Sequence, residues 1–232
     1  MAVTVPMLAL EPNHPDRERL RQLGEKVRRR MAANKTAVSL PSERAELWAI
    51  AGFFNPAECT GLASMIDAVA QPSRMYSDES GPGFRTSHSG VLDPRDRLVR
   101  QLQRRIDTLL GFDRSHAEML QGQRYTQGQE FKPHTDWFPQ NSPGWAAECD
   151  NGGQRAFTAM VYLNDVADGG ETDFPRLDLA VTPRQGVLLV WNNADRDGVP
   201  NPFTIHAGNP VGSGTKYVVT RWYRCRPTLQ AG

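Results

Sequence analysis

The sequence of 232 residues lacks the features that define several protein classes. Its three cysteines, Cys59, Cys149 and Cys225, are odd in number and have no C-x-x-C spacing, so we expect reduced thiols in a cytoplasmic protein. No run of about eighteen or more apolar residues occurs, and residues 1–10 lack a basic stretch; we expect neither a membrane span nor a secretory signal. The net charge of +1 gives no electrostatic reason to expect a nucleic-acid partner, and it leaves the oligomeric state open.

The composition that remains is that of an ordinary globular protein. Hydrophobic residues make up 39% and charged residues 23%, which is enough for one sizeable core. We expect an N-terminal helical arm and linker over residues 1–45 and one domain over residues 46–232. The arm has apolar residues at helical spacing, namely Leu20, Leu23, Val27 and Met31. It is either a surface helix that packs on the domain or an interaction arm that uses Arg28 to Arg30.

Two further helices are predicted before a β-rich half. Asn55 is a good N-cap, Pro56 suits the first helical position and Glu58 completes a capping box, so this helix should reach about Val69. A second helix should start at Asp93-Pro94, with Leu98, Leu102, Ile106 and Leu109 facing inward. Strands are expected at Leu47–Ala51 and Arg85–Leu92, and a mobile loop at Gln71–Gly83.

The rest of the chain predicts many short strands separated by glycine and proline turns. The expected strands are Glu118–Thr126, Phe131–Trp137, Arg155–Leu163, Glu171–Phe174, Gly186–Trp191, Phe203–Ala207 and Lys216–Cys225. This pattern indicates an α+β fold, mainly β, with a sandwich or small barrel braced by the preceding helices. Two long loops, Pro139–Gly153 and Asn192–Pro202, are expected to be functional or disordered.

Two histidines and one carboxylate form a candidate metal site. His134 and Asp136 stand at positions i and i+2, so on one strand their side chains share a face. His206 would complete the set from another strand. Neutral imidazole and carboxylate ligands suit Fe(II), and three protein ligands leave open positions for other molecules. An isolated H-x-D motif is weak evidence for a metal site, so the surrounding residues must support that assignment.

Lys216 follows His206 across a glycine-rich turn and can lie on the antiparallel neighbour of the strand that carries His206. A buried ammonium group there would need a partner, and a carboxylate ligand that chelates the metal would provide one. Without that context, Lys216 reads as an ordinary surface lysine.

These residues resemble the prolyl 4-hydroxylase group of iron(II)- and 2-oxoglutarate-dependent dioxygenases. The resemblance rests on Gln123–Gln129 leading into His134-x-Asp136, on Arg155–Leu163, on Gly169–Pro175, and on the spacing of His206 and Lys216. It covers about residues 47–226. It implies a double-stranded β-helix (jelly-roll) core, in agreement with the predicted strands.

The resemblance also implies roles for individual residues. His134, Asp136 and His206 would bind Fe(II), and Lys216 would pair with the distal carboxylate of 2-oxoglutarate, helped by the hydroxyl groups of Tyr125 and Thr172. O2 is the second co-substrate, and ascorbate is a candidate accessory reductant. The positions that line the substrate side of the pocket in relatives correspond to Arg85, Ser87, Glu118, Arg155 and Trp222.

Four features leave the substrate open. Phe131 stands where some peptidyl-prolyl hydroxylases carry tyrosine, and Arg224 stands where some carry histidine. Glu118 and Arg155 could simply pair with each other. The aromatic cluster Trp137, Phe138 and Trp145 could be core or a lid over a proline ring.

The leading hypothesis is therefore a hydroxylase of prolyl residues in a peptide or protein. The closest alternative is the same chemistry on a free amino acid, a small metabolite or another protein side chain. A metal-binding sensor module without turnover, and a cupin-type isomerase or hydrolase, are the readings from other classes.

Overall fold

We describe the fold from a computed structural model, over residues 16–73 and 83–229. The helices are α1 (Arg17–Ala33), α2 (Pro56–Val69), α3 (Arg97–Leu110) and α4 (Trp145–Asp150), with short 3-10 helices η2 (Arg114–His116) and η3 (Pro202–Thr204). The strands are β1 (Val38–Ser39), β2 (Leu47–Ile50), β3 (Gln71–Pro72), β4 (His88–Val91), β5 (Gln121–Thr126), β6 (Phe131–His134), β7 (Arg155–Tyr162), β8 (Asp168–Gly169), β9 (Thr172–Phe174), β10 (Leu179–Val181), β11 (Leu188–Asn192), β12 (His206–Gly208), β13 (Val211–Ser213) and β14 (Thr215–Arg224).

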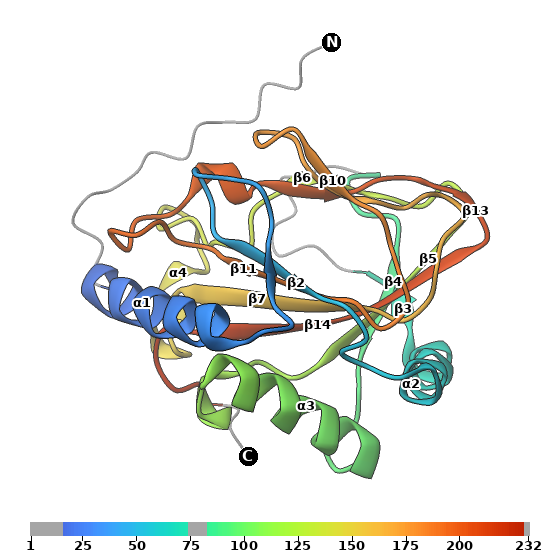
Figure 1. The fold of residues 1–232 in the computed structure, drawn as a ribbon, viewed down its shortest axis with the longest axis horizontal. Helices are drawn as coiled ribbons and strands as arrows, with labels where there is room; N and C mark the ends of the chain where they lie inside the picture. Colours follow the sequence, from blue (N-terminus) through green and yellow to red (C-terminus); the bar gives the residue numbers. More distant parts are fainter. Residues whose placement is uncertain (1–15, 74–82, 230–232) are drawn as a thin grey trace.

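The strands form two main antiparallel sheets (Figure 1). The larger sheet has the order β1-β2-β11-β7-β14-β5-β4-β3, and the smaller one has the order β10-β9-β12-β6. A short pair, β13-β8, lies apart from both. Two facing sheets built from strands distant in sequence make a jelly-roll, so the predicted fold class is confirmed.

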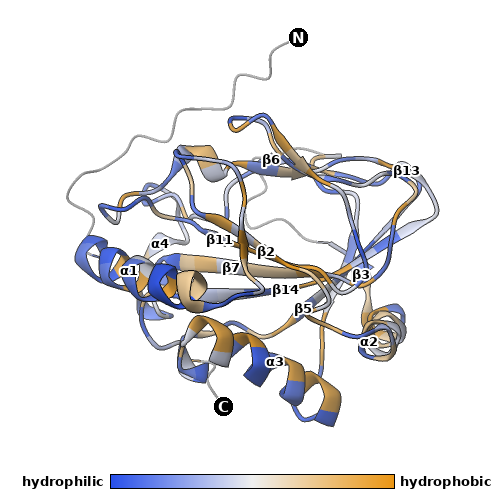
Figure 2. Ribbon diagram, viewed as in Figure 1, coloured by the Kyte–Doolittle hydropathy of each residue, from blue (hydrophilic) through white to orange (hydrophobic). Residues whose placement is uncertain are grey.

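The central strands of the larger sheet are buried on both faces because they alternate their side chains between two apolar clusters. On β11, Leu188 and Val190 pack into the cluster beneath the helices, while Leu189 and Trp191 pack between the two sheets. Figure 2 shows the hydrophobic residues running along β2, β7 and β11. One face of the large sheet thus supports the helices, and the other forms one wall of the interior between the sheets.

The helices cover the outer face of the larger sheet. The capping box of α2 forms as predicted: the Asn55 side chain accepts from the backbone N–H of Glu58, whose carboxylate accepts from the Asn55 N–H. In α1, Leu20, Val27 and Met31 are buried in the main cluster. The three arginines of the proposed interaction arm have intramolecular partners, which supports a packing helix: Arg28 pairs with Glu46, Arg29 with Glu25, and Arg30 donates to the carbonyl oxygens of Thr108 and Leu109.

Some predicted boundaries are wrong. The helix expected at Asp93 starts at Arg97, because the Asp96 side chain caps it, and Val99 and Leu110 are buried where Leu98 and Leu109 are only partly so. The strand expected at Phe203–Ala207 is split into η3 and β12. Strands β10 and β13 were not predicted, and the long loop Pro139–Gly153 contains α4.

Most of the loop expected at Gln71–Gly83 lies outside the described residues, and its first two residues form β3. Among the helices that the structure describes, none has the length and apolar character needed to cross a membrane.

Candidate active site

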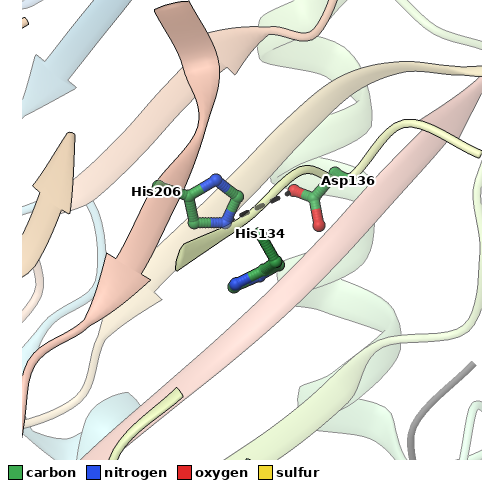
Figure 3. A group of neighbouring side chains, drawn as sticks. All are labelled: His134, Asp136 and His206. Carbon is green, nitrogen blue, oxygen red and sulfur yellow. Dashed lines mark ion pairs between the residues drawn. The ribbon is translucent and has the colours of Figure 1, made fainter. Parts of the chain in front are cut away.

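His134, Asp136 and His206 converge between the two sheets (Figure 3). His134 ends β6 and faces His206, the first residue of β12, as its register partner. One ligand atom from each of the three side chains lies within 4.8 Å of the others, and His206 Nε2 is 3.8 Å from Asp136 Oδ2. The prediction that one strand carries both His134 and Asp136 is wrong in detail: β6 ends at His134, and Asp136 reaches the site from the bend that follows.

Both imidazole rings are oriented by backbone carbonyl groups. His134 Nδ1 is 2.9 Å from the Lys132 oxygen, and His206 Nδ1 is 3.0 Å from the Thr204 oxygen. A carbonyl oxygen only accepts, so each Nδ1 carries a proton, and in the neutral ring each Nε2 keeps its lone pair for a metal. Burial and the neighbouring His206 hold the pKa of His134 well below its usual value, which keeps this ring neutral. Two neutral imidazoles and one carboxylate fit Fe(II).

Asp136 is held by residues that the sequence did not single out. Thr158 Oγ1 donates to Asp136 Oδ2 at 2.6 Å, and Asn193 Nδ2 donates to Thr158 Oγ1 at 3.0 Å. Burial raises the pKa of Asp136, but His206, Arg155 and His134 outweigh burial and keep the pKa below its usual value. The carboxylate is therefore charged and oriented. Nothing local in the sequence marks Thr158 or Asn193 for this role.

Lys216 reaches the same interior from the opposite sheet. The predicted neighbour relation with the strand of His206 is wrong, because β14 lies between β7 and β5 in the larger sheet while β12 belongs to the smaller one. The Lys216 side chain is 3% exposed, and its Nζ lies 5.3 Å from the centre of the Tyr125 ring and 5.7 Å from that of Tyr162. Burial lowers the pKa of Lys216 to about 7.

Among the described residues, no carboxylate lies within ion-pair distance of Lys216. The buried ammonium group thus fits an anion supplied by a ligand.

The two hydroxyl residues predicted to help Lys216 lie in the same pocket. Tyr125 is the register partner of Lys216 on β5, and its hydroxyl donates to Gln123 at 2.9 Å. The Thr172 hydroxyl accepts from Tyr162 at 2.7 Å. The pocket is lined by both residues together with the metal-binding set, Lys216 and others that the sequence did not indicate, among them Gln123 and Trp191.

The five predicted substrate residues divide into two groups. Arg85 and Trp222 line the pocket, and Ser87 accepts a hydrogen bond from Arg85. Glu118 and Arg155 form a two-fold hydrogen-bonded ion pair, with both contacts at 2.7 Å, which is the alternative considered from the sequence.

Arg155 lies between two aromatic rings, 4.2 Å from the centre of Trp222 and 4.7 Å from that of Phe138. Arg224 also binds Glu118, and it binds Glu148 of α4 at 2.7 Å. Trp137 and Phe138 are buried at 6% and 5% exposure, so these two rings belong to the core and are not a lid.

Comparisons with known proteins agree with this site. Residues 120–224 match the model of the 2OG-Fe(II) oxygenase superfamily. Prolyl 4-hydroxylase 2 of Arabidopsis thaliana is 27% identical over 215 residues, which cover 82% of this chain and 70% of that protein. The alpha-1 subunit of rat (Rattus norvegicus) prolyl 4-hydroxylase is 35% identical over 140 residues, 60% of this chain but 26% of the subunit.

Solved structures show the same relationship. The 2OG complex of a viral collagen prolyl hydroxylase from Paramecium Bursaria Chlorella virus-1 has a TM-score of 0.60 and 27% identity, and the match covers 76% of this chain and 94% of that one. A Trichoplax adhaerens prolyl hydroxylase in complex with a hypoxia inducible factor peptide shares the fold, with a TM-score of 0.59, 16% identity, and coverage of 89% of this chain and 91% of that one. The chain therefore belongs to the 2OG-Fe(II) oxygenase superfamily, as an Fe(II)- and 2-oxoglutarate-dependent dioxygenase similar to prolyl 4-hydroxylases.

Proposed function

We propose that this enzyme hydroxylates prolyl residues of a peptide or protein. One atom of O2 enters a C–H bond of the proline ring as a hydroxyl group, and the other enters succinate as 2-oxoglutarate loses CO2. The observation that carries the proposal is the arrangement of the pocket: a His134–Asp136–His206 metal set on one side and the unpaired Lys216 ammonium on the other.

The residues of the chain divide the work. His134, Asp136 and His206 would hold Fe(II), which when bound supplies the activation of O2. Lys216 binds the distal carboxylate of 2-oxoglutarate through a charge-assisted hydrogen bond, and Tyr125 and Thr172 flank that end of the pocket. Buried aromatic residues such as Trp191 and Phe174 exclude water from the region behind His206.

Two observations support a prolyl substrate. The named relatives are prolyl 4-hydroxylases, similar over most of this chain. Trp222, which lines the pocket, is held in place by Arg155 over its ring, and its apolar surface suits the C–H groups of a proline ring.

The alternative is the same chemistry on a free amino acid, a small metabolite or another protein side chain. It is favoured by two departures from the resemblance, Phe131, which lines the pocket, and Arg224, which does not. Phe131 offers no hydroxyl group to a peptide, and its ring is stacked on His134 with 3.5 Å between centres. Arg224 is engaged by Glu118 and Glu148, so it does not present a free donor to a substrate.

The test is an aerobic incubation of the purified protein with Fe(II), ascorbate and 2-oxoglutarate. Proline-containing peptides, free amino acids and other peptides are compared, and mass spectrometry follows succinate and the gain of one oxygen atom. We expect oxygen on proline and no product with His206→Ala. Oxygen only on another compound would establish the alternative, and no succinate from the folded wild-type protein would refute both.

A further inference from the structure

The arginines that are buried or half-buried in the interior of the described β-core have carboxylate partners, with one exception. The paired ones are Arg155 with Glu118 at 2.7 Å, Arg221 with Asp107 at 2.8 Å, and Arg224 with Glu148 at 2.7 Å. Arg85 lines the active-site pocket, and its hydrogen-bond partners are neutral groups: Ser87 Oγ at 3.1 Å, Gln121 Oε1 at 3.4 Å and the Tyr125 hydroxyl. No carboxylate of the described residues lies within 4 Å of its guanidinium group.

The position of Arg85 places it near the reacting centre. Its Cζ lies 4.7 Å from the centre of the Phe131 ring, and the opposite partner of that ring is His134, stacked at 3.5 Å with 15° between the planes. A single aromatic ring therefore connects the guanidinium group to a metal ligand. Arg85 and the metal-binding set also line one pocket, so a group that Arg85 binds lies in the pocket that holds the metal site.

The pocket thus contains two cations without an ionic partner among the described residues, Lys216 and Arg85. Lys216 takes the distal carboxylate of 2-oxoglutarate, and the keto-acid end of that molecule belongs at the metal. Burial lowers the pKa of Arg85, although Asp136 raises it, so this cation is incompletely compensated. Asp136 cannot serve as its direct partner because it is oriented toward the two imidazoles and held by Thr158.

We propose that Arg85 binds a carboxylate group of the substrate within this pocket. This inference rests on the proposed function and narrows it: the prolyl substrate carries either its own α-carboxylate, as a C-terminal proline, or an acidic side chain beside the proline. The planar guanidinium group, backed by Phe131, presents its remaining N–H groups to a carboxylate in the geometry that such pairs prefer.

The experiment measures binding to the anaerobic Fe(II)–2-oxoglutarate complex by calorimetry, so that no turnover intervenes. Matched pairs differ only in charge: N-acetyl-proline and its amide, a peptide ending in proline and its C-terminal amide, and a peptide with Asp beside an internal proline and its Asn counterpart. We expect the acid of at least one pair to bind about tenfold to a hundredfold more tightly than its neutral partner. The pair that shows the preference identifies the source of the carboxylate.

The variants separate recognition from folding. Arg85→Gln should abolish the preference while Fe(II) and 2-oxoglutarate still bind, and Arg85→Lys should retain part of it because the charge remains. Arg95→Gln, which changes an arginine with 89% side-chain exposure, should leave the preference unchanged.

Two results would overturn the inference about Arg85 and leave the proposed prolyl function intact. One is equal binding of acids and neutral partners by the wild type, and the other is a preference for acids that survives in Arg85→Gln. If no proline compound binds in either form although 2-oxoglutarate is still consumed, the proposed prolyl function fails and this inference fails with it.

Discussion

The Asp136 carboxylate is held by a hydrogen-bond relay whose direction follows from simple chemistry. A hydroxyl group has one proton. Because the Thr158 hydroxyl accepts from the Asn193 amide at 3.0 Å, its own proton is directed to Asp136 at 2.6 Å. Thr158 is fully buried, so water does not compete for these bonds. Such partners orient metal ligands and affect metal affinity without touching the metal.

Replacing Thr158 by valine should weaken Fe(II) binding by roughly tenfold or more, because the carboxylate loses the donor that fixes it. An anaerobic Fe(II) titration measures the change. The control is Thr220→Val, since Thr220 is also buried in the pocket and accepts from the Gln123 amide at 3.2 Å, but contacts no metal ligand. Equal losses in the two variants would show that burial, and not the relay, explains the effect.

Lys216 predicts a pH dependence for the co-substrate. Its pKa is about 7 before 2-oxoglutarate binds, and the bound carboxylate needs the ammonium form. Above that pH, binding must take up a proton, so the KM for 2-oxoglutarate should rise toward tenfold per pH unit. Lys216→Arg, which stays charged, should remove the rise. Kinetics between about pH 6 and 8.5 measure it, and a flat wild-type profile would contradict the assignment.

The same pKa affects folding in the absence of ligand. The pKa of Lys216 is lower in the folded protein than the ordinary lysine value of 10.5, because the side chain is buried. Between these values the unfolded chain binds a proton that the folded chain does not, so this group lowers stability as the pH falls from about 10.5 to about 7.

The start of helix α2 could be predicted from local sequence, whereas the strand neighbours of Lys216 could not. The capping box of α2 involves residues three apart, so its start at Pro56 could be predicted from the sequence. Pairing of β14 with β5 and β7 joins residues far apart in the chain, and no local pattern specifies it. The spacing of His206 and Lys216 therefore indicated a shared pocket correctly but assigned them to the wrong neighbouring strands.

The ion-pair cluster that joins β7, β14 and α4 should be costly to break. Burial raises the pKa of Glu118, but Arg155 and Arg224 outweigh it, so the carboxylate is charged and binds both guanidinium groups. Glu118→Gln should lower the unfolding free energy by roughly 3 kcal/mol, measured by chemical denaturation. The exposed pair Asp93–Arg95 provides the control, because Asp93→Asn should change stability by less than about 1 kcal/mol.

The same contacts determine how the unfolding free energy changes with pH. Because the pKa of Glu118 lies below its usual value of 4.5, its contribution is present above that pH and is lost as the pH falls further. A Glu118→Gln variant should therefore lose less stability than the wild type on acidification. Equal acid sensitivity of the two proteins would contradict this account.

Helix α1 is part of the folded domain, although the sequence did not decide between a packing helix and an interaction arm. Leu20 is 1% exposed and belongs to the same apolar cluster as Leu188 and Val190 of the large sheet. Leu20→Ala should cost about 3 kcal/mol of unfolding free energy, since it leaves a cavity in that cluster. Leu229→Ala, at a leucine that is 79% exposed, should have little effect. Similar stabilities of the two variants would argue that α1 packs too loosely to support the sheet.

The two facing sheets account for why the site was partly predictable. The metal set could be proposed because its residue types and order are specific, and the jelly-roll brings β6 and β12 together as register partners. Thr158, Asn193 and the unpaired state of Arg85 could not be proposed, because they depend on side-chain contacts across the interior.

The central claim is that one Fe(II) and one 2-oxoglutarate bind together between the sheets. An anaerobic calorimetric titration of the purified chain with both tests it directly. We predict one equivalent of each per chain, loss of Fe(II) binding in Asp136→Ala, and loss of 2-oxoglutarate binding in Lys216→Ala with Fe(II) retained. Binding of both by all variants, or of neither by the wild type, would contradict it.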